Sequence, residues 1–145
     1  MKTTVTTLAL ATLIILTPLA TTPADLEKMA VRQSAMKFIG AQMRQLSGMA
    51  RGQSDLNAPY VAAVGSSIAI IGDSLSLWFD DLPEGYPHAD SEALPVIAAN
   101  RDAFLAQAEK MADAGRAMAS APDALAASFQ SLSSTCRSCH SQFRM

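Results

Sequence analysis

The sequence predicts an all-α fold, an antiparallel four-helix bundle with a long loop between the second and third helices. Alanine is abundant after residue 25 whereas Val, Ile and Thr are sparse, which favours helix over sheet. Apolar residues recur at steps of three, four and seven, the spacing of one helix face. Only one of the three links is long, and short links join antiparallel neighbours. The 145 residues suffice for one domain and are too few for two.

Residues 1–24 precede the first predicted helix and have the build of a secretory signal peptide. Lys2 provides a positive charge, residues 5–19 are apolar and uncharged, and Ala24 or Ala20 can serve as the small residue before a cleavage site. The apolar run of about 15 residues is short against the ~20 that cross a bilayer, so an uncleaved anchor is only the alternative. We expect export, cleavage and no stable membrane insertion afterwards, because no second apolar segment of spanning length follows.

A short link separates the first two predicted helices. The apolar spacing predicts the first helix over 25–49, and Gly52 suits a left-handed cap after it. Asn57 is a candidate N-cap for the second helix, over 59–79, which begins with a proline. The second helix is apolar on most sides and should be well buried. The apolar positions of the two helices are Leu26, Met29, Met36, Ile39, Met43, Leu46, Val61, Val64, Ile68, Ile70, Ile71 and Leu75.

Residues 80–100 form the long connection and contain three prolines. A loop of this length in a compact domain is usually functional or packed on something. Asn100 should cap a third helix over 101–119, and a fourth helix is predicted over 122–143. The residues expected to face inward are Phe104, Leu105, Ala108, Met111, Ala112, Met118, Leu125, Phe129 and Leu132.

The motif that carries chemistry lies near the C-terminus. Cys136 and Cys139 are the only cysteines, and His140 follows at once. At positions i, i+3 and i+4 of a helix, the three side chains project from one face. This geometry suits a covalently attached haem, with one thioether per cysteine and the imidazole reaching the iron from the same side. Cys-x-x-Cys-His is the c-type attachment signature. The motif agrees with export, since such haem is attached outside the cytoplasm.

Other uses of these residues have to be weighed. A disulfide would close a very small loop and be strained within a helix, and a thioredoxin-like dithiol needs a βαβ context. Zinc needs four ligands; His88 would be the fourth, but two adjacent ligands in the motif make an awkward tetrahedron. His88 by itself indicates a surface residue. Met29, Met36 and Met43 recur every seven residues. This spacing indicates core packing, with a copper-binding cluster as the alternative.

Charge and motif content exclude several classes of protein. The net charge is −2, from 11 basic and 13 acidic residues, and no two Lys or Arg residues are adjacent. No basic patch therefore indicates nucleic acid as a partner. No nucleophile–base pair or acidic dyad is apparent, so we expect no enzyme.

In the order of its parts the chain resembles the class II cytochromes c, that is, the cytochrome c′ group and its low-spin relatives. The resemblance extends over residues 25–145, the expected haem-binding bundle. Its most specific part is the haem motif at the extreme C-terminus. The matching segments are 136–144, 32–37 in the first helix, 48–52 at its end, and 82–85 with Pro95 and Ile97 in the long loop.

The resemblance implies a role for each of several residues. The cofactor is one haem c, attached covalently through two thioethers. By this resemblance, His140 and Met36 are the iron ligands, and Arg144 lies beside the proximal imidazole. The residues that contact the cofactor are Cys136, Cys139, Arg32, Gln33 and Glu92.

The residues themselves leave alternatives to two of these roles. Arg32 lies four residues before Met36 on an otherwise apolar face, where a haem propionate is a natural partner for a charge. A solvated arginine at the edge of the bundle is the alternative. For Gln33 the alternative is a plain surface position.

For a chain that binds haem, two functions are open at this stage. An iron held by His and Met is a one-electron carrier, because Met raises the reduction potential. An iron held by His alone is high-spin and five-coordinate, and its open position takes a small gas such as nitric oxide. We expect a periplasmic electron-transfer cytochrome, with the gas-binding cytochrome c′ as the alternative and a haem-free metal or dithiol protein as a third reading. The resemblance also implies redox partner proteins in the periplasm and a homodimer formed through the first two helices.

Overall fold

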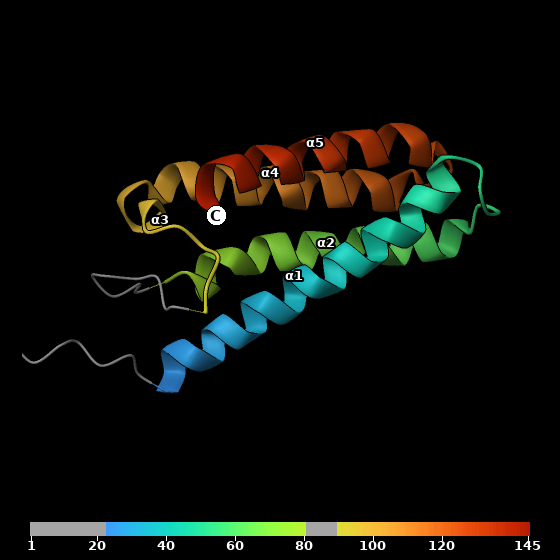
Figure 1. The fold of residues 1–145 in the computed structure, drawn as a ribbon. Helices are drawn as coiled ribbons and strands as arrows, with labels where there is room; N and C mark the ends of the chain where they lie inside the picture. Colours follow the sequence, from blue (N-terminus) through green and yellow to red (C-terminus); the bar gives the residue numbers. More distant parts are fainter. Residues whose placement is uncertain (1–22, 81–89) are drawn as a thin grey trace, which may run out of the picture.

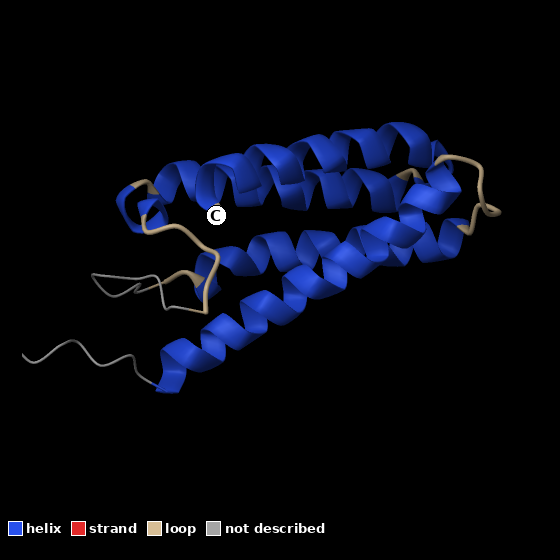
Figure 2. Ribbon diagram, viewed as in Figure 1, coloured by secondary structure: helices blue, strands red, loops and turns tan. Residues whose placement is uncertain are grey.

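Four long helices make up most of the computed structural model, which describes residues 23–80 and 90–145 (Figure 1). The all-α fold is confirmed, and helices and loops account for the whole of the described chain (Figure 2). The expected boundaries hold to within three residues. The elements are α1, Pro23–Ala50; α2, Ala58–Trp78; α3, Val96–Ala99; α4, Arg101–Ser120; the 3-10 helix η1, Pro122–Ala124; and α5, Leu125–Phe143.

Two local signals act as the sequence predicts. Asn57 caps α2, and its side-chain oxygen accepts a hydrogen bond from the backbone N–H of Tyr60 at 3.0 Å. Gly52, just after α1, has a φ of 68°, which other residues rarely adopt. Both signals depend only on neighbouring residues, so they do not depend on how the helices pack.

Asn100 occupies the N-cap position of α4, as predicted, but its side chain makes no capping hydrogen bond. Asn100 also ends α3, a single turn that the sequence did not predict, and its backbone N–H donates to Val96 O at 2.9 Å. Its backbone oxygen accepts from Phe104 N, so Asn100 belongs to both helices and its geometry is set by both.

Several expectations lie outside the described residues. The signal peptide falls there apart from its last two residues, as do the matching segment 82–85 and His88.

Helices α2 and α4 approach so closely that their backbones touch. A Cβ on Gly65 would lie 2.7 Å from both Ala119 N and Gly115 O. A Cβ on Gly115 would lie 2.7 Å from Ala69 N and from Gly65 O. Since real side chains do not come this near to backbone, only glycine permits this helix pair. The tight pair forms one side of the bundle and buries the middle of α2.

Helix α2 is nonetheless less covered than its composition predicts. Ile70 and Leu77, seven residues apart on one side, are 66% and 67% exposed, so the expected burial of Ile70 is wrong. Leu26, the first apolar position of α1, is 40% exposed. Val61 and Ile68 of α2 are fully buried, whereas Ile71 is half-buried.

By length and composition alone, α2 could cross a membrane, and it is the only described helix of which this is true. The expectation that no second segment of spanning length follows is therefore wrong. Seven of its residues are buried within the bundle, among them Val64 and Leu75. The apolar character of these seven residues is explained by their packing in the bundle.

Helix α1 lies at an angle to the rest of the bundle. Figure 1 shows α1 close to the start of α5 at one end and drawing away from it towards Pro23. Helices α4 and α5 run side by side, and the rings of Phe104 and Phe143 meet edge-on with centroids 5.4 Å apart. The wedge between α1 and α5 holds the candidate site.

Candidate haem site

A cavity of about 680 Å³ lies between α1 and α5. Side chains of these two helices form its long walls, and the chain segment Asp90–Ala93 borders it. Helices α2 and α4 add mainly apolar side chains, including Phe79, Ala108 and Met111. Such a large space with apolar walls suits a flat, mostly apolar ligand.

The structure places all three residues of the C-terminal motif on the α5 wall. Cys136 and Cys139 are half-buried free thiols, and burial raises the pKa of both, with the charge of Cys136 adding to the effect at Cys139. His140 is exposed and also lines the cavity. Burial of part of its ring lowers the pKa of His140, as does the nearby Arg144 guanidinium, while Glu92 acts in the opposite direction. At neutral pH this arrangement favours neutral thiols and a neutral imidazole.

Met36 lies on the opposite wall, on α1. It is half-buried and packs against the core, as does Met43, and Met29 lines the cavity with them. The structure thus brings Met36 to the same cavity as His140, from another helix. It does not single out Met36 from the other two methionines, because all three share this wall.

Arg32 is buried, with 6% of its surface exposed, and it lines the cavity. This excludes a solvated arginine at the edge of the bundle. Its guanidinium donates to Trp78 O at 2.6 Å and lies 4.4 Å from the centroid of the Phe79 ring. Arg101 donates to Ser76 O at 3.2 Å. Two arginines therefore satisfy the last carbonyl groups of α2, where a helix dipole favours positive charge. This accounts for part of the burial of Arg32 without a cofactor.

Gln33 is also placed at the cavity, and it holds the neighbouring loop. Its side-chain nitrogen donates to Asp90 O at 2.7 Å, across 57 residues of sequence. The alternative of a plain surface position is thereby excluded, since the side chain joins α1 to the segment that borders the cavity.

The same segment is tied to the end of α5. Leu94 N donates to Phe143 O at 2.9 Å, and Met145 N donates to Glu92 O at 2.8 Å. Arg144 Nε donates to Glu92 Oε2 at 2.6 Å. The Glu92 carboxylate and the Arg144 guanidinium therefore neutralise each other. Both residues line the cavity, and both are close enough to His140 to influence its pKa.

The described residues give no support to the zinc alternative, whose fourth ligand, His88, lies outside them. Within 23–80 and 90–145, His, Cys, Asp and Glu form no group of three or more that could hold a metal ion. Both cysteines are free, so the disulfide alternative is not realised either.

A comparison with protein families decides what this cavity belongs to. Residues 27–144 match the family model described as Cytochrome C'. The chain belongs to the cytochrome c′ family. Two similar relatives are a cytochrome c′ of Pararhodospirillum photometricum, 36% identical over 118 residues, and a cytochrome c-556 of Agrobacterium tumefaciens strain II Chrys, 32% identical over 118 residues. These matches cover 78% and 79% of this chain, and 92% and 93% of the two relatives.

A solved structure of similar fold is cytochrome c′ of Rhodopseudomonas palustris. It superimposes with a TM-score of 0.73, covers 81% of this chain and 95% of its own, and is 24% identical. At this level of identity the likeness shows the fold. Membership of the cytochrome c′ family makes the protein a haem-binding electron carrier or gas binder, with haem c as its cofactor.

The residues of this chain fit a bound haem. Cys136 and Cys139 are spaced and placed compatibly with two thioethers on one wall of the cavity. Gln107 also lines the cavity, and its side-chain oxygen is buried with no hydrogen-bond partner among the described residues. A buried carbonyl without a partner costs about 1–3 kcal/mol.

Sequence reasoning missed Gln107. The signal was present: Gln107 follows Phe104 by three residues and precedes Ala108, and both neighbours face inward on α4. A polar residue at such a position of a helix indicates a partner in the interior.

Proposed function

We propose that the protein is a one-electron carrier of the periplasm that holds one haem c between α1 and α5. The observation that carries the proposal is the cavity itself, which has Cys136, Cys139 and His140 on one wall and Met36 on the other. When bound, the haem supplies a single iron that alternates between the ferric and ferrous states. The proposal includes no catalytic step.

Each residue has a stated part in this proposal. The two cysteines attach the cofactor, and His140, whose lowered pKa favours the neutral ring, ligates the iron. Arg32, Gln33 and Glu92 contact the cofactor at its edge. Met36 is the second iron ligand, since thioether sulfur binds haem iron and its flexible side chain can adjust its reach. Arg144 lies beside the proximal imidazole.

Visible absorption of the purified protein tests the proposal. We expect the haem to stay with the polypeptide through acid extraction and to give a c-type pyridine haemochrome spectrum. A low-spin ferric spectrum with a sulfur-to-iron band in the far red is the expected sign of Met36 ligation. Haem that extracts freely would refute covalent attachment, and a high-spin ferric spectrum at neutral pH would refute ligation by Met36.

The second candidate is a gas-binding cytochrome c′. One observation favours it: Met29 and Met43 line the same wall as Met36, so packing alone explains why a methionine is there. Nitric oxide is bound in a solved complex of an Alcaligenes xylosoxidans cytochrome c′, which is 20% identical to this chain and has a TM-score of 0.69. A high-spin ferric protein that binds nitric oxide would establish this function in place of electron transfer.

Export belongs to the same proposal. A mature N-terminus at Asp25 is expected in protein from a periplasmic fraction, with cleavage after Ala20 as the fallback. An intact Met1 in a washed membrane fraction would show an anchor instead. N-terminal sequencing distinguishes the three outcomes.

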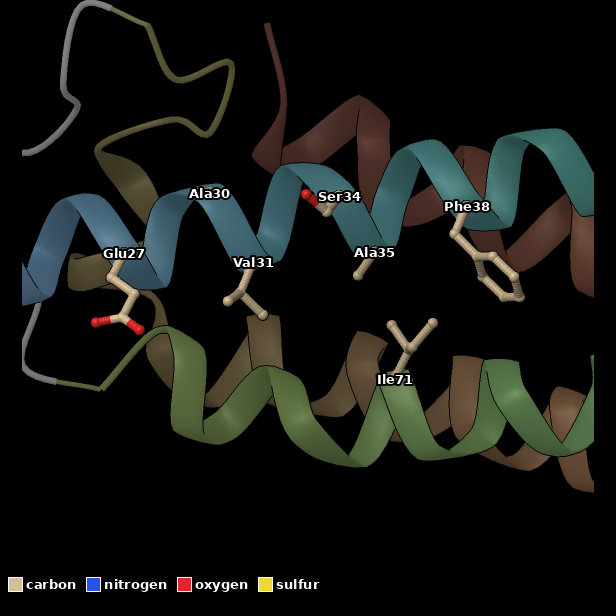
Figure 3. A pocket seen from close by; sticks show the side chains of 7 residues that line it. All are labelled: Glu27, Ala30, Val31, Ser34, Ala35, Phe38 and Ile71. Atoms are coloured by element: carbon tan, nitrogen blue, oxygen red, sulfur yellow. The ribbon is translucent and has the colours of Figure 1, made fainter.

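We also propose a homodimer through α1 and α2. A groove between these helices is lined by Val31, Phe38 and Ile71, and Figure 3 shows the three side chains on its two sides. Val31 and Phe38 are 41% and 42% exposed, and Ile70 of α2 is 66% exposed. One solved relative is described as having ligand-controlled dimer dissociation. Sedimentation of the wild type and of Phe38→Glu should give a dimer and a monomer, respectively; equal masses would refute this interface.

A further inference from the structure

Positive charge is unevenly distributed over the bundle. Arg101, Arg116 and Arg144 form ion pairs with Asp80, with Asp73 and Asp113, and with Glu92. In contrast, six described cations form no ion pair with a described acidic residue: Lys28, Lys37, Arg44, Arg51, Lys110 and Arg137. For Lys37, Arg44 and Arg137 the sequence explains the difference, because α1 contains no Asp or Glu after Glu27 and α5 contains none at all.

Of these, Lys37 lines the haem cavity, and Arg44 and Arg137 lie next to residues that line it, on the two helices that form its long walls. Lys37 is exposed and lines the cavity on α1. The guanidinium of Arg44 lies 4.0 Å from the position of a Cβ on Gly40, which lines the cavity as well. Arg137 is exposed on α5 between the two cysteines and three residues before His140. We call Lys37, Arg44 and Arg137 the cationic rim.

The cationic rim outweighs the acidic residues near it. Arg144 brings no net charge to the border, because Glu92 neutralises it. Asp90 and Glu92 lie together at one end of the cavity, on the segment that Gln33 and Arg144 hold, whereas Lys37 and Arg44 follow the opposite direction along α1. The molecule carries a formal net charge of −2, whereas the three side chains of the cationic rim are positive. Local fields, rather than net charge, steer an approaching partner.

We propose that the cationic rim is the docking surface for an acidic redox partner protein, which exchanges one electron with the haem across this border. This inference rests on the electron-carrier function proposed above. An acidic partner is attracted to these three cations. None of them has to break an existing ion pair before it can bind the partner. Attraction of this kind raises association rates by 10-fold or more and falls steeply with ionic strength.

Small charged one-electron reagents can stand in for the partner protein and test the rim. Oxidation of the reduced holoprotein by ferricyanide transfers one electron and yields ferric protein and ferrocyanide. Stopped-flow rates with this anion should fall as salt rises, because the Debye length shrinks from about 30 Å at 0.01 M to about 3 Å at 1 M. Rates with the cation tris(phenanthroline)cobalt(III) should rise or stay level over the same range.

Variants then locate the effect. Lys37→Gln, Arg44→Gln and Arg137→Gln should each lower the ferricyanide rate about two- to fivefold at low salt and flatten its salt dependence. Arg51→Gln is the matched control, since Arg51 is an exposed, unpaired arginine just after α1 and no residue from 44 to 74 lines the cavity. It should leave the rate unchanged.

Each other outcome has a definite meaning. If neither reagent exchanges electrons, the electron-carrier function itself fails. If both react at rates that ignore salt and the rim variants, the carrier function stands and the docking surface is refuted. If the rim variants shift the reduction potential but leave the salt dependence unchanged, the cations serve the carboxylates of the haem, and the docking surface is likewise refuted.

Discussion

Glu92 and Arg144 are 52 residues apart in sequence and form a charged hydrogen bond of 2.6 Å at the edge of the haem cavity. The pair joins the described end of the long loop to the residue that follows α5. It lies where two backbone hydrogen bonds already connect the same segments, through Leu94 and Met145. The carboxylate expected to touch the cofactor is therefore held by the arginine expected beside the proximal imidazole.

Loss of this ion pair should change stability only slightly. The Arg144 and Glu92 side chains are 48% and 64% exposed, and pairs as exposed as this contribute about 0–1 kcal/mol. Glu92→Gln should therefore lower the free energy of unfolding by less than about 1 kcal/mol. Chemical denaturation of the holoprotein measures this, with Glu109→Gln on α4 as control. A loss above about 3 kcal/mol would mean that the pair acts as a buried one.

Met36→Ala separates the two candidate functions. If Met36 ligates the iron, the variant should change the ferric spectrum from low-spin to high-spin and lose the far-red band, because the sulfur ligand is gone. It should also open the iron to small ligands. Met43→Ala is the matched control from the same wall and should keep the wild-type spectrum. An unchanged spectrum in Met36→Ala, together with altered nitric oxide binding, would contradict the electron-carrier function.

Gly65→Ala and Gly115→Ala should destabilise the bundle. In each case the new methyl group would meet backbone atoms of the facing helix at 2.7 Å, which can be relieved only by moving α2 away from α4. Overpacking of this kind costs about 1–3 kcal/mol. Gly48→Ala is the control, because its Cβ would meet only the Ser54 side chain at 3.4 Å. Thermal unfolding gives the ranking, and equal stability of all three variants would contradict the close approach.

The two thiols should resist alkylation in the folded, haem-free chain. Because burial raises the pKa of Cys136 and Cys139, the folded chain keeps thiol protons that the unfolded chain releases. Iodoacetamide should therefore react more slowly before than after unfolding, and the pH midpoint of the reaction should lie higher. By the same linkage, stability is lost as pH rises past the ordinary thiol pKa of about 9. A slower reaction with an unchanged midpoint would indicate shielding alone.

Gln107→Leu should have effects of opposite sign in the haem-free and haem-containing proteins. Without haem, the substitution removes a buried carbonyl that lacks a partner, and we expect a gain of about 1 kcal/mol. With haem, we expect the amide N–H group of Gln107 to donate to a haem carboxylate, so the same substitution should destabilise. The comparison uses the Cys136→Ser/Cys139→Ser background and the holoprotein, with the exposed Gln130→Leu as control. The same sign in both would show that Gln107 makes no contact with the cofactor.

The sequence by itself determined the features that depend on near neighbours. Helical spacing placed the four long helices, Asn57 and Gly52 marked the ends that they mark in the structure, and the i, i+3, i+4 order put Cys136, Cys139 and His140 on one face. Each of these is fixed within about one helical turn, where the covalent chain dictates which groups can meet.

Only the tertiary structure decided which distant groups meet. In the folded chain Arg32 bonds to the end of α2, and Glu92 pairs with Arg144. Ile70 stays exposed, and the Gln107 side-chain oxygen has no partner among the described residues. These outcomes depend on how whole helices approach one another, and a small change in the angle of α1 would alter the partner of Arg32. Helix periodicity states which face of a helix is apolar, but the partner of that face is set by the packing of the complete bundle.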